Sequence, residues 1–112
     1  MSLIDTCTNV LIRGILRGKV YQEYKAALEA LQKMPDVKRR VDEMRLLNYQ
    51  MQMNDEEIDL YDSIDQIDSQ MEELSRIPEV AVFMESELAL CRQLQEINAV
   101  IHQGIHLDIP DL

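Results

Sequence analysis

Two matching seven-residue segments decide how this chain folds: Leu31-Gln32-Lys33-Met34-Pro35-Asp36-Val37 and Leu74-Ser75-Arg76-Ile77-Pro78-Glu79-Val80. Corresponding positions lie 43 residues apart, as from 35 to 78, and each segment places an acidic residue directly after a proline. The residue before a proline avoids helical geometry, whereas proline suits the first helical position and the helix dipole stabilises an acid beside it. Each segment therefore predicts the end of one helix and the start of the next.

Helical periodicity fills the stretches around these two turns. We expect four helices: Ser2 to about Lys33, opened by a capping box with Asp5; Pro35 to about Met53; Asn54, a good N-cap, to the second turn; and Pro78 to Gly104. Residues 105–112 are expected to form a tail, which leaves a single helical domain over residues 1–104. The repeat is compatible with a duplicated helical hairpin. It is also compatible with the simpler explanation that any helix–proline–acid–helix junction has such a sequence.

Composition agrees with a helical protein. The 112 residues suffice for one domain, hydrophobic residues make up 46%, and the chain has one Phe, no Trp, three Gly and three Pro. We predict an all-α fold: an antiparallel bundle of two helical hairpins with a long first helix, present as an oligomer.

Charge is distributed unevenly along the chain. The formal net charge is -10, and the stretch from Leu46 to Ser75 contains nine acidic residues and no Lys or Arg. This balance opposes binding to nucleic-acid phosphates and favours protein partners, with the acidic third helix available to a basic surface. The run Lys38-Arg39-Arg40 leaves weak direct RNA binding as an alternative.

The first helix is apolar around more of its circumference than one neighbour can cover. Gly14 and Gly18 would each cost about 1 kcal/mol relative to Ala in mid-helix, which a close crossing by another helix, from this chain or a second copy, would explain. A locally irregular helix is the other explanation. The third helix has the cleanest apolar stripe. We predict that the oligomer or partner interface consists of Leu11, Gly14, Gly18, Tyr21, Tyr24, Leu60, Ile64, Ile67 and Met71.

No residue pattern indicates catalysis or a metal site, so we predict neither an enzyme nor a bound cofactor. Cys7 and Cys91 occupy apolar helical positions without a second cysteine nearby, which favours packed core thiols. His102 and His106 lie one helical turn apart, and a metal or redox sensor using these residues across subunits stays the alternative. With no segment typical of a signal peptide or membrane span, we expect a cytoplasmic protein with reduced thiols.

A set of motifs resembles a known family. They are Ile15 and Gly18 with Tyr21-Gln22-Glu23-Tyr24-Lys25, the turn Pro35-Asp36-Val37, Val41-Asp42-Glu43-Met44-Arg45 with Asn48-Tyr49-Gln50-Met51-Gln52, and Pro78-Glu79-Val80 with Phe83-Met84-Glu85-Ser86-Glu87. In this order and spacing, over about residues 10–101, they resemble the YlbF/YmcA family of small helical bacterial regulators.

The resemblance implies an oligomeric, non-catalytic protein that works by protein–protein binding. Relatives form complexes with paralogues and engage the endoribonuclease RNase Y, and so influence RNA processing, competence, biofilm formation and sporulation. Some relatives share iron–sulfur clusters held by cysteines. This chain departs from that pattern, because no cysteine follows Gly104 and Cys91 stands alone on its helix. The expected partners are therefore a second copy, paralogous regulators and an endoribonuclease, with no cluster.

Overall fold

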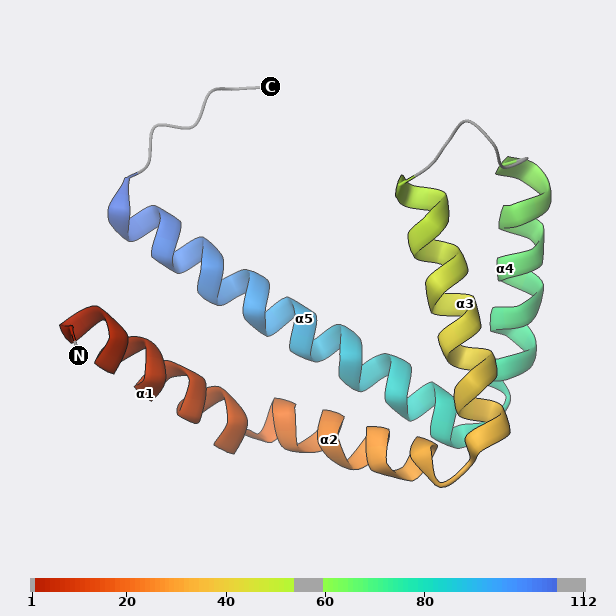
Figure 1. Ribbon diagram of the computed structural model, residues 1–112, viewed down its shortest axis with the longest axis horizontal. Coiled ribbons are helices and arrows are strands. Elements are labelled where there is room, and N and C mark those ends of the chain that lie inside the picture. Colours follow the sequence, from red (N-terminus) through yellow and green to blue (C-terminus); the bar gives the residue numbers. More distant parts are fainter. Residues whose placement is uncertain (1, 54–59, 107–112) are drawn as a thin grey trace. The chain divides into compact units, whose positions relative to one another are not determined.

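The computed structural model describes residues 2–53 and 60–106, and within these ranges the regular structure is entirely helical. Figure 1 follows the helices along the chain. Their bounds are α1 Leu3–Arg17, α2 Lys19–Gln32, α3 Pro35–Met53, α4 Leu60–Ser75 and α5 Pro78–Ile105. The all-α prediction is confirmed for this part of the chain.

The predicted cap of the first helix is present. The backbone N–H of Asp5 donates to Ser2 Oγ at 3.1 Å, and the Ser2 N–H donates to Asp5 Oδ2 at 3.4 Å. This reciprocal pair satisfies two N–H groups that a helix start otherwise leaves without partners.

The prediction of one long first helix is wrong, because two helices occupy this part of the chain. α1 ends at Arg17, Gly18 is extended with φ -75° and ψ 159°, and α2 begins at Lys19. The Gly18 N–H donates to the carbonyl of Ile15 at 3.1 Å, and the Gln22 side chain donates to the carbonyl of Leu16 at 2.6 Å. Glycine has low helix propensity, and these two bonds satisfy carbonyls that the break exposes.

The two proline turns have the same backbone geometry. Met34 N–H donates to Leu31 O at 2.9 Å, and Ile77 N–H donates to Leu74 O at 3.0 Å. In the first turn of the following helix, the N–H groups of Lys38 and Ala81 donate to Met34 and Ile77. Both predicted helix starts, at residues 35 and 78, are thereby confirmed.

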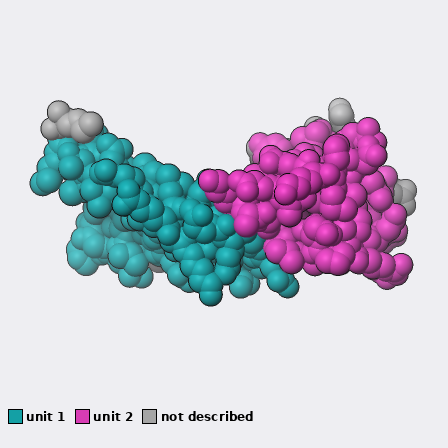
Figure 2. Space-filling model, turned by 90° about the horizontal axis from the view of Figure 1, so that it is seen from below, with its two compact units in different colours: residues 1–24, 85–112 teal, residues 25–84 magenta. Residues whose placement is uncertain are grey.

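The chain divides into two compact units, residues 1–24 with 85–112 and residues 25–84, which Figure 2 colours separately. In the unit of residues 25–84, α3 and α4 pack side by side. Arg40 near the start of α3 contacts Glu73 near the end of α4, so the two helices are antiparallel. This unit holds the apolar core: Ala27, Leu31, Val41, Met44, Leu74, Val80 and Phe83.

The unit of residues 1–24 and 85–112 contains α1, the first part of α2 and most of α5. α5 continues through Gly104, where we had expected its end, and stops at Ile105 before His106 with φ 56°. Asn54, the predicted cap of the third helix, lies outside the described residues. The single domain over residues 1–104 and the bundle of two hairpins stay predictions.

Candidate interaction surface

The surface of α1 is apolar around more than half of its circumference. Its charged and amide side chains, Asp5, Asn9, Arg13 and Arg17, recur every four residues and so form one stripe. No residue of α1 is buried. We define the apolar face of α1 as the exposed large side chains outside that stripe: Leu3, Ile4, Val10, Leu11, Ile12 and Leu16.

A shallow groove of about 460 Å³ lies between α1 and the C-terminal part of α5, within one unit. Its side chains are mostly apolar, and the largest stay open to solvent: Leu11 is 40% exposed, Leu94 46% and Ile101 45%. α5 therefore covers only part of α1. The lining residues are Leu11, Ile15, Leu94, Gln95, Ile97, Asn98 and Ile101.

The two glycines of the first helix have different surroundings. A Cβ added to Gly14 would meet nothing within 4 Å, so none of the described segments crosses α1 there. A Cβ added to Gly18 would lie 3.3 Å from the Ile15 carbonyl oxygen and 3.4 Å from that of Gly14. Gly18 thus ends a helix, as the alternative of an irregular helix had allowed, while Gly14 presents bare backbone beside Leu11.

Tyr21 and Tyr24 lie on α2 in the same unit as α1. Both are half-buried, and their ring centroids are 6.3 Å apart with planes inclined by 38°. This spacing is within the range of favourable aromatic pairs. The rings therefore support each other, and together with Leu11, Gly14 and Gly18 they belong to one unit.

The remaining predicted interface residues lie in the other unit, on α4. Ile64 is exposed and Ile67 and Met71 are half-buried, whereas the side chain of Leu60 is outside the described residues. On the outer side of this helix we define the acidic α4 face as Asp65, Asp68 and Glu72, which are all exposed. Glu72 pairs with Arg76 at 3.3 Å, and in the described ranges Asp65 and Asp68 have no basic partner.

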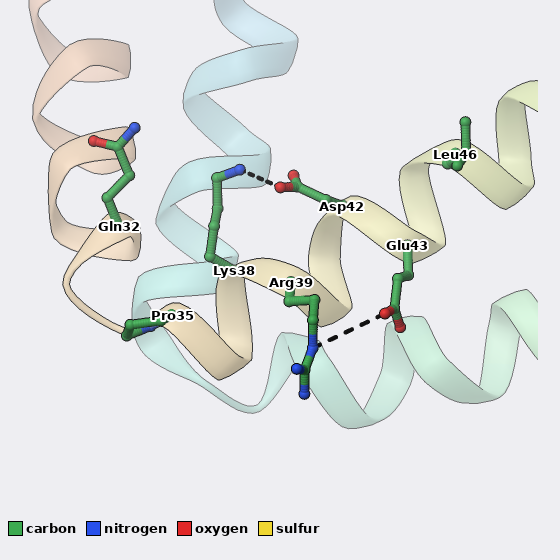
Figure 3. Close-up of a pocket in the computed structure, with 7 residues that line it drawn as sticks. All are labelled: Gln32, Pro35, Lys38, Arg39, Asp42, Glu43 and Leu46. Atoms are coloured by element: carbon green, nitrogen blue, oxygen red, sulfur yellow. Dashed lines mark hydrogen bonds and ion pairs between the residues drawn. The ribbon is translucent and has the colours of Figure 1, made fainter.

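The basic run at the start of α3 is neutralised by carboxylates. The run borders a groove of about 550 Å³. Figure 3 shows that Lys38 there reaches Asp42 and Arg39 reaches Glu43. Arg40 points elsewhere and contacts Glu73, with Nη2 and Oε1 2.9 Å apart. Each cation of the run has a carboxylate partner, which a nucleic-acid phosphate would have to displace.

Both thiols are exposed, so the prediction of packed core cysteines is wrong. Cys7 lies on α1 and Cys91 on α5, and the described residues do not cover either thiol as their apolar positions predicted. In residues 2–53 and 60–106, no three His, Cys, Asp or Glu side chains gather around a common metal position. No helix in these ranges is long and apolar enough to span a membrane.

The interface predicted from the sequence does not include the α5 side of the groove between α1 and α5. Leu94, Ile97 and Ile101 form the stripe of α5, and their spacing of three and four residues was visible in the sequence. What the pattern could not show is that this stripe lies beside Leu11 and Ile15. The predicted interface itself is not tested by a single copy of the chain.

The family of this chain follows from comparison with known proteins. No curated protein and no solved structure is significantly similar to it. A family model described as control of the competence regulator ComK, YlbF/YmcA, matches residues 4–106, nearly the whole chain. This chain therefore belongs to the YlbF/YmcA family, a regulatory family that acts in the control of competence.

Proposed function

We propose that this protein is a non-catalytic adaptor that regulates competence by binding other proteins in the cytoplasm. Its targets are a second copy, paralogous regulators and an endoribonuclease, whose RNA processing it modulates and through which it affects biofilm formation and sporulation. The observation that carries the proposal is the apolar face of α1, whose side chains are each at least 40% exposed although α5 lies beside part of the helix.

An apolar face of this extent favours association. Burying a Leu or Ile side chain contributes about 1.5–3 kcal/mol, and six large apolar residues of α1 are exposed. Monomeric proteins seldom expose a continuous apolar surface of this kind without using it. A second copy supplies a matching face, so self-association is the simplest use of α1.

The acidic α4 face supports a second contact of different chemistry. Asp65 and Asp68 have no basic partner in the described ranges, and Ile64 beside them is 40% exposed. Complementary charge directs partners to a surface and raises the rate of association. We assign this face to a basic surface on the regulated machinery, while the apolar face of α1 serves assembly.

Solution mass and partner capture test the proposal together. Light scattering should give at least twice the chain mass of 13.1 kDa, and Leu11→Glu should reduce it toward one copy. The matched control is Arg13→Glu, on the polar stripe of the same helix. Tagged protein should recover a ribonuclease or a paralogue from its native cytoplasm, and Asp65→Lys with Asp68→Lys should lose that partner while keeping the mass. A single-copy protein that captures neither would contradict the proposal.

A further inference from the structure

The break at Gly18 interrupts an apolar pattern that continues across it in register. Leu11, Gly14, Gly18 and Tyr21 follow one another at spacings of three and four residues. In a continuous helix these positions would share one face. The pattern therefore fits an unbroken helix from Leu3 to Gln32, while the structure has two helices.

The broken state is held by specific hydrogen bonds. In an unbroken helix the Leu16 carbonyl would accept from the backbone four residues on. Here it accepts instead from Nε2 of Gln22 at 2.6 Å, while the backbone N–H of Gln22 donates to Gly18 O at 3.1 Å as it would in a continuous helix. The Gln22 side chain thus replaces one of the bonds that the break removes, and a continuous helix would regain the bonds from the N–H groups of Lys19, Val20 and Tyr21.

Little packing holds α1 in place beyond the break. None of its residues is buried, and its contact with α5 is the shallow groove at Leu11 and Ile15. Elements with few buried apolar contacts move at low cost in free energy. α1 is therefore able to turn about Gly18 without disturbing the core, whose residues all lie in the other unit.

We propose that Gly18 is a hinge between the capped break and a continuous α1–α2 helix, and that binding of a second copy favours the continuous state. The inference rests on the proposed self-association. Straightening would extend the surface around Leu11 and Gly14 to Tyr21, so a partner would bury more in the continuous state. A ligand shifts a conformational equilibrium by its difference in affinity for the two states.

Two adjacent substitutions bias the hinge in opposite directions. Gly18→Ala should favour the continuous helix, because Ala has higher helix propensity and its Cβ would crowd the Ile15 carbonyl in the broken state. Lys19→Pro should lock the break, because residue 19 opens α2, where proline fits, and Gly18 before it is already extended. Lys19→Ala is the control for losing the exposed Lys19 side chain.

Spin labels on either side of the hinge provide the measurement. Asn9→Cys and Glu23→Cys, both at exposed positions, are labelled in the full chain carrying Cys7→Ser and Cys91→Ser. Their backbone positions would be about 21 Å apart in a continuous helix. Lys19→Pro supplies the reference distance of the broken state, in which Gly18 is extended. Distances and solution mass are recorded on the same samples over a concentration series.

The expected result has four parts. The background protein shows the Lys19→Pro distance when dilute and about 21 Å once its mass doubles. Gly18→Ala shows about 21 Å throughout and associates at lower concentration. Lys19→Pro keeps one distance at every concentration and associates at a concentration at least tenfold higher. Lys19→Ala behaves like the background.

Either of two results overturns the inference: Gly18→Ala gives the same distance as Lys19→Pro, or the associated background protein keeps the Lys19→Pro distance. A background protein that stays single-copy at every concentration contradicts the proposed self-association, and with it the proposed coupling between association and the hinge. The hinge is then decided separately, by whether Gly18→Ala shows about 21 Å while Lys19→Pro shows a different distance.

Discussion

Arg40 of α3 and Glu73 of α4 form an ion pair that joins the two helices of the hairpin, with Nη2 and Oε1 2.9 Å apart. Both side chains are more than two-fifths exposed. Solvent screening limits such pairs to less than about 1 kcal/mol. The pair marks where α3 and α4 meet, and the buried apolar side chains of the same unit supply most of the stability.

The first prediction concerns this pair. Arg40→Ala and Glu73→Ala should each lower the free energy of unfolding by less than about 1 kcal/mol, and the double variant should show a coupling of similar size. Urea denaturation of the full chain measures all three. A loss of several kcal/mol from either single variant would show that the pair is a main source of stability, against this expectation.

The core of residues 25–84 should be far more sensitive. Phe83 is 0% exposed, so Phe83→Ala should cost about 3–5 kcal/mol through lost burial and the cavity left behind. The guanidinium of Arg45 lies 5.4 Å from the ring centroid and would lose a cation–π contact as well. The matched control is Val82→Ala, one residue earlier on α5 and 54% exposed, which should change stability by less than about 0.5 kcal/mol.

Substitutions at Gly14 should affect the stability of the single chain and its self-association in different ways. Because nothing lies within 4 Å of an added Cβ, Gly14→Ala should raise the free energy of unfolding by up to about 1 kcal/mol at concentrations where the protein is single-copy. If a second copy crosses α1 there, Gly14→Leu should weaken association by blocking the close approach. Equal association by the wild type and Gly14→Leu, measured by light scattering, would remove Gly14 from the interface.

The basic run should not bind RNA. Lys38, Arg39 and Arg40 are paired with carboxylates, and the net charge is -10. We expect no binding to single-stranded RNA. The steep fall in affinity between about 50 and 200 mM salt that phosphate contacts cause should therefore not be seen. Fluorescence anisotropy checks this, with Arg39→Glu plus Arg40→Glu as the comparison. Salt-dependent binding that this double variant abolishes would restore the RNA-binding alternative.

The exposed thiols report on the apolar face of α1. Cys7 and Cys91 should both react with an alkylating reagent in the native dilute protein, since both are exposed. Cys7 lies four residues before Leu11, so its reaction should slow as the protein associates. Mass spectrometry of peptides gives the two rates. A visible absorption spectrum or bound metal in anaerobically purified protein would instead favour the sensor alternative.

Local signals in the sequence were sufficient for the helix boundaries at Ser2, Pro35 and Pro78. A capping box and a proline act through neighbouring residues, so their effect depends little on the rest of the fold. The repeated segments predicted two similar turns, and the hydrogen bonds at Met34 and Ile77 agree with this.

The missed features depend on what lies opposite each residue. Periodicity continues through Gly18, and the cap from Gln22 to Leu16 that holds the break joins residues six apart, a spacing no helix pattern contains. Cys7 and Cys91 were expected in the core because apolar positions are usually covered. Among the residues that the structure describes, none covers α1 fully, so a face that looks like core from the sequence is surface in one copy.

The two proline turns share backbone hydrogen bonds, which suggests that one turn could replace the other. Leu31 and Leu74 are both fully covered, each carbonyl accepts from the residue three positions on, and the following helix begins in the same way. An exchange of the heptapeptides at 31–37 and 74–80 would therefore keep the direction change at both places. The helices on either side of a proline turn could then be lengthened, by evolution or by design, without changing the turn itself.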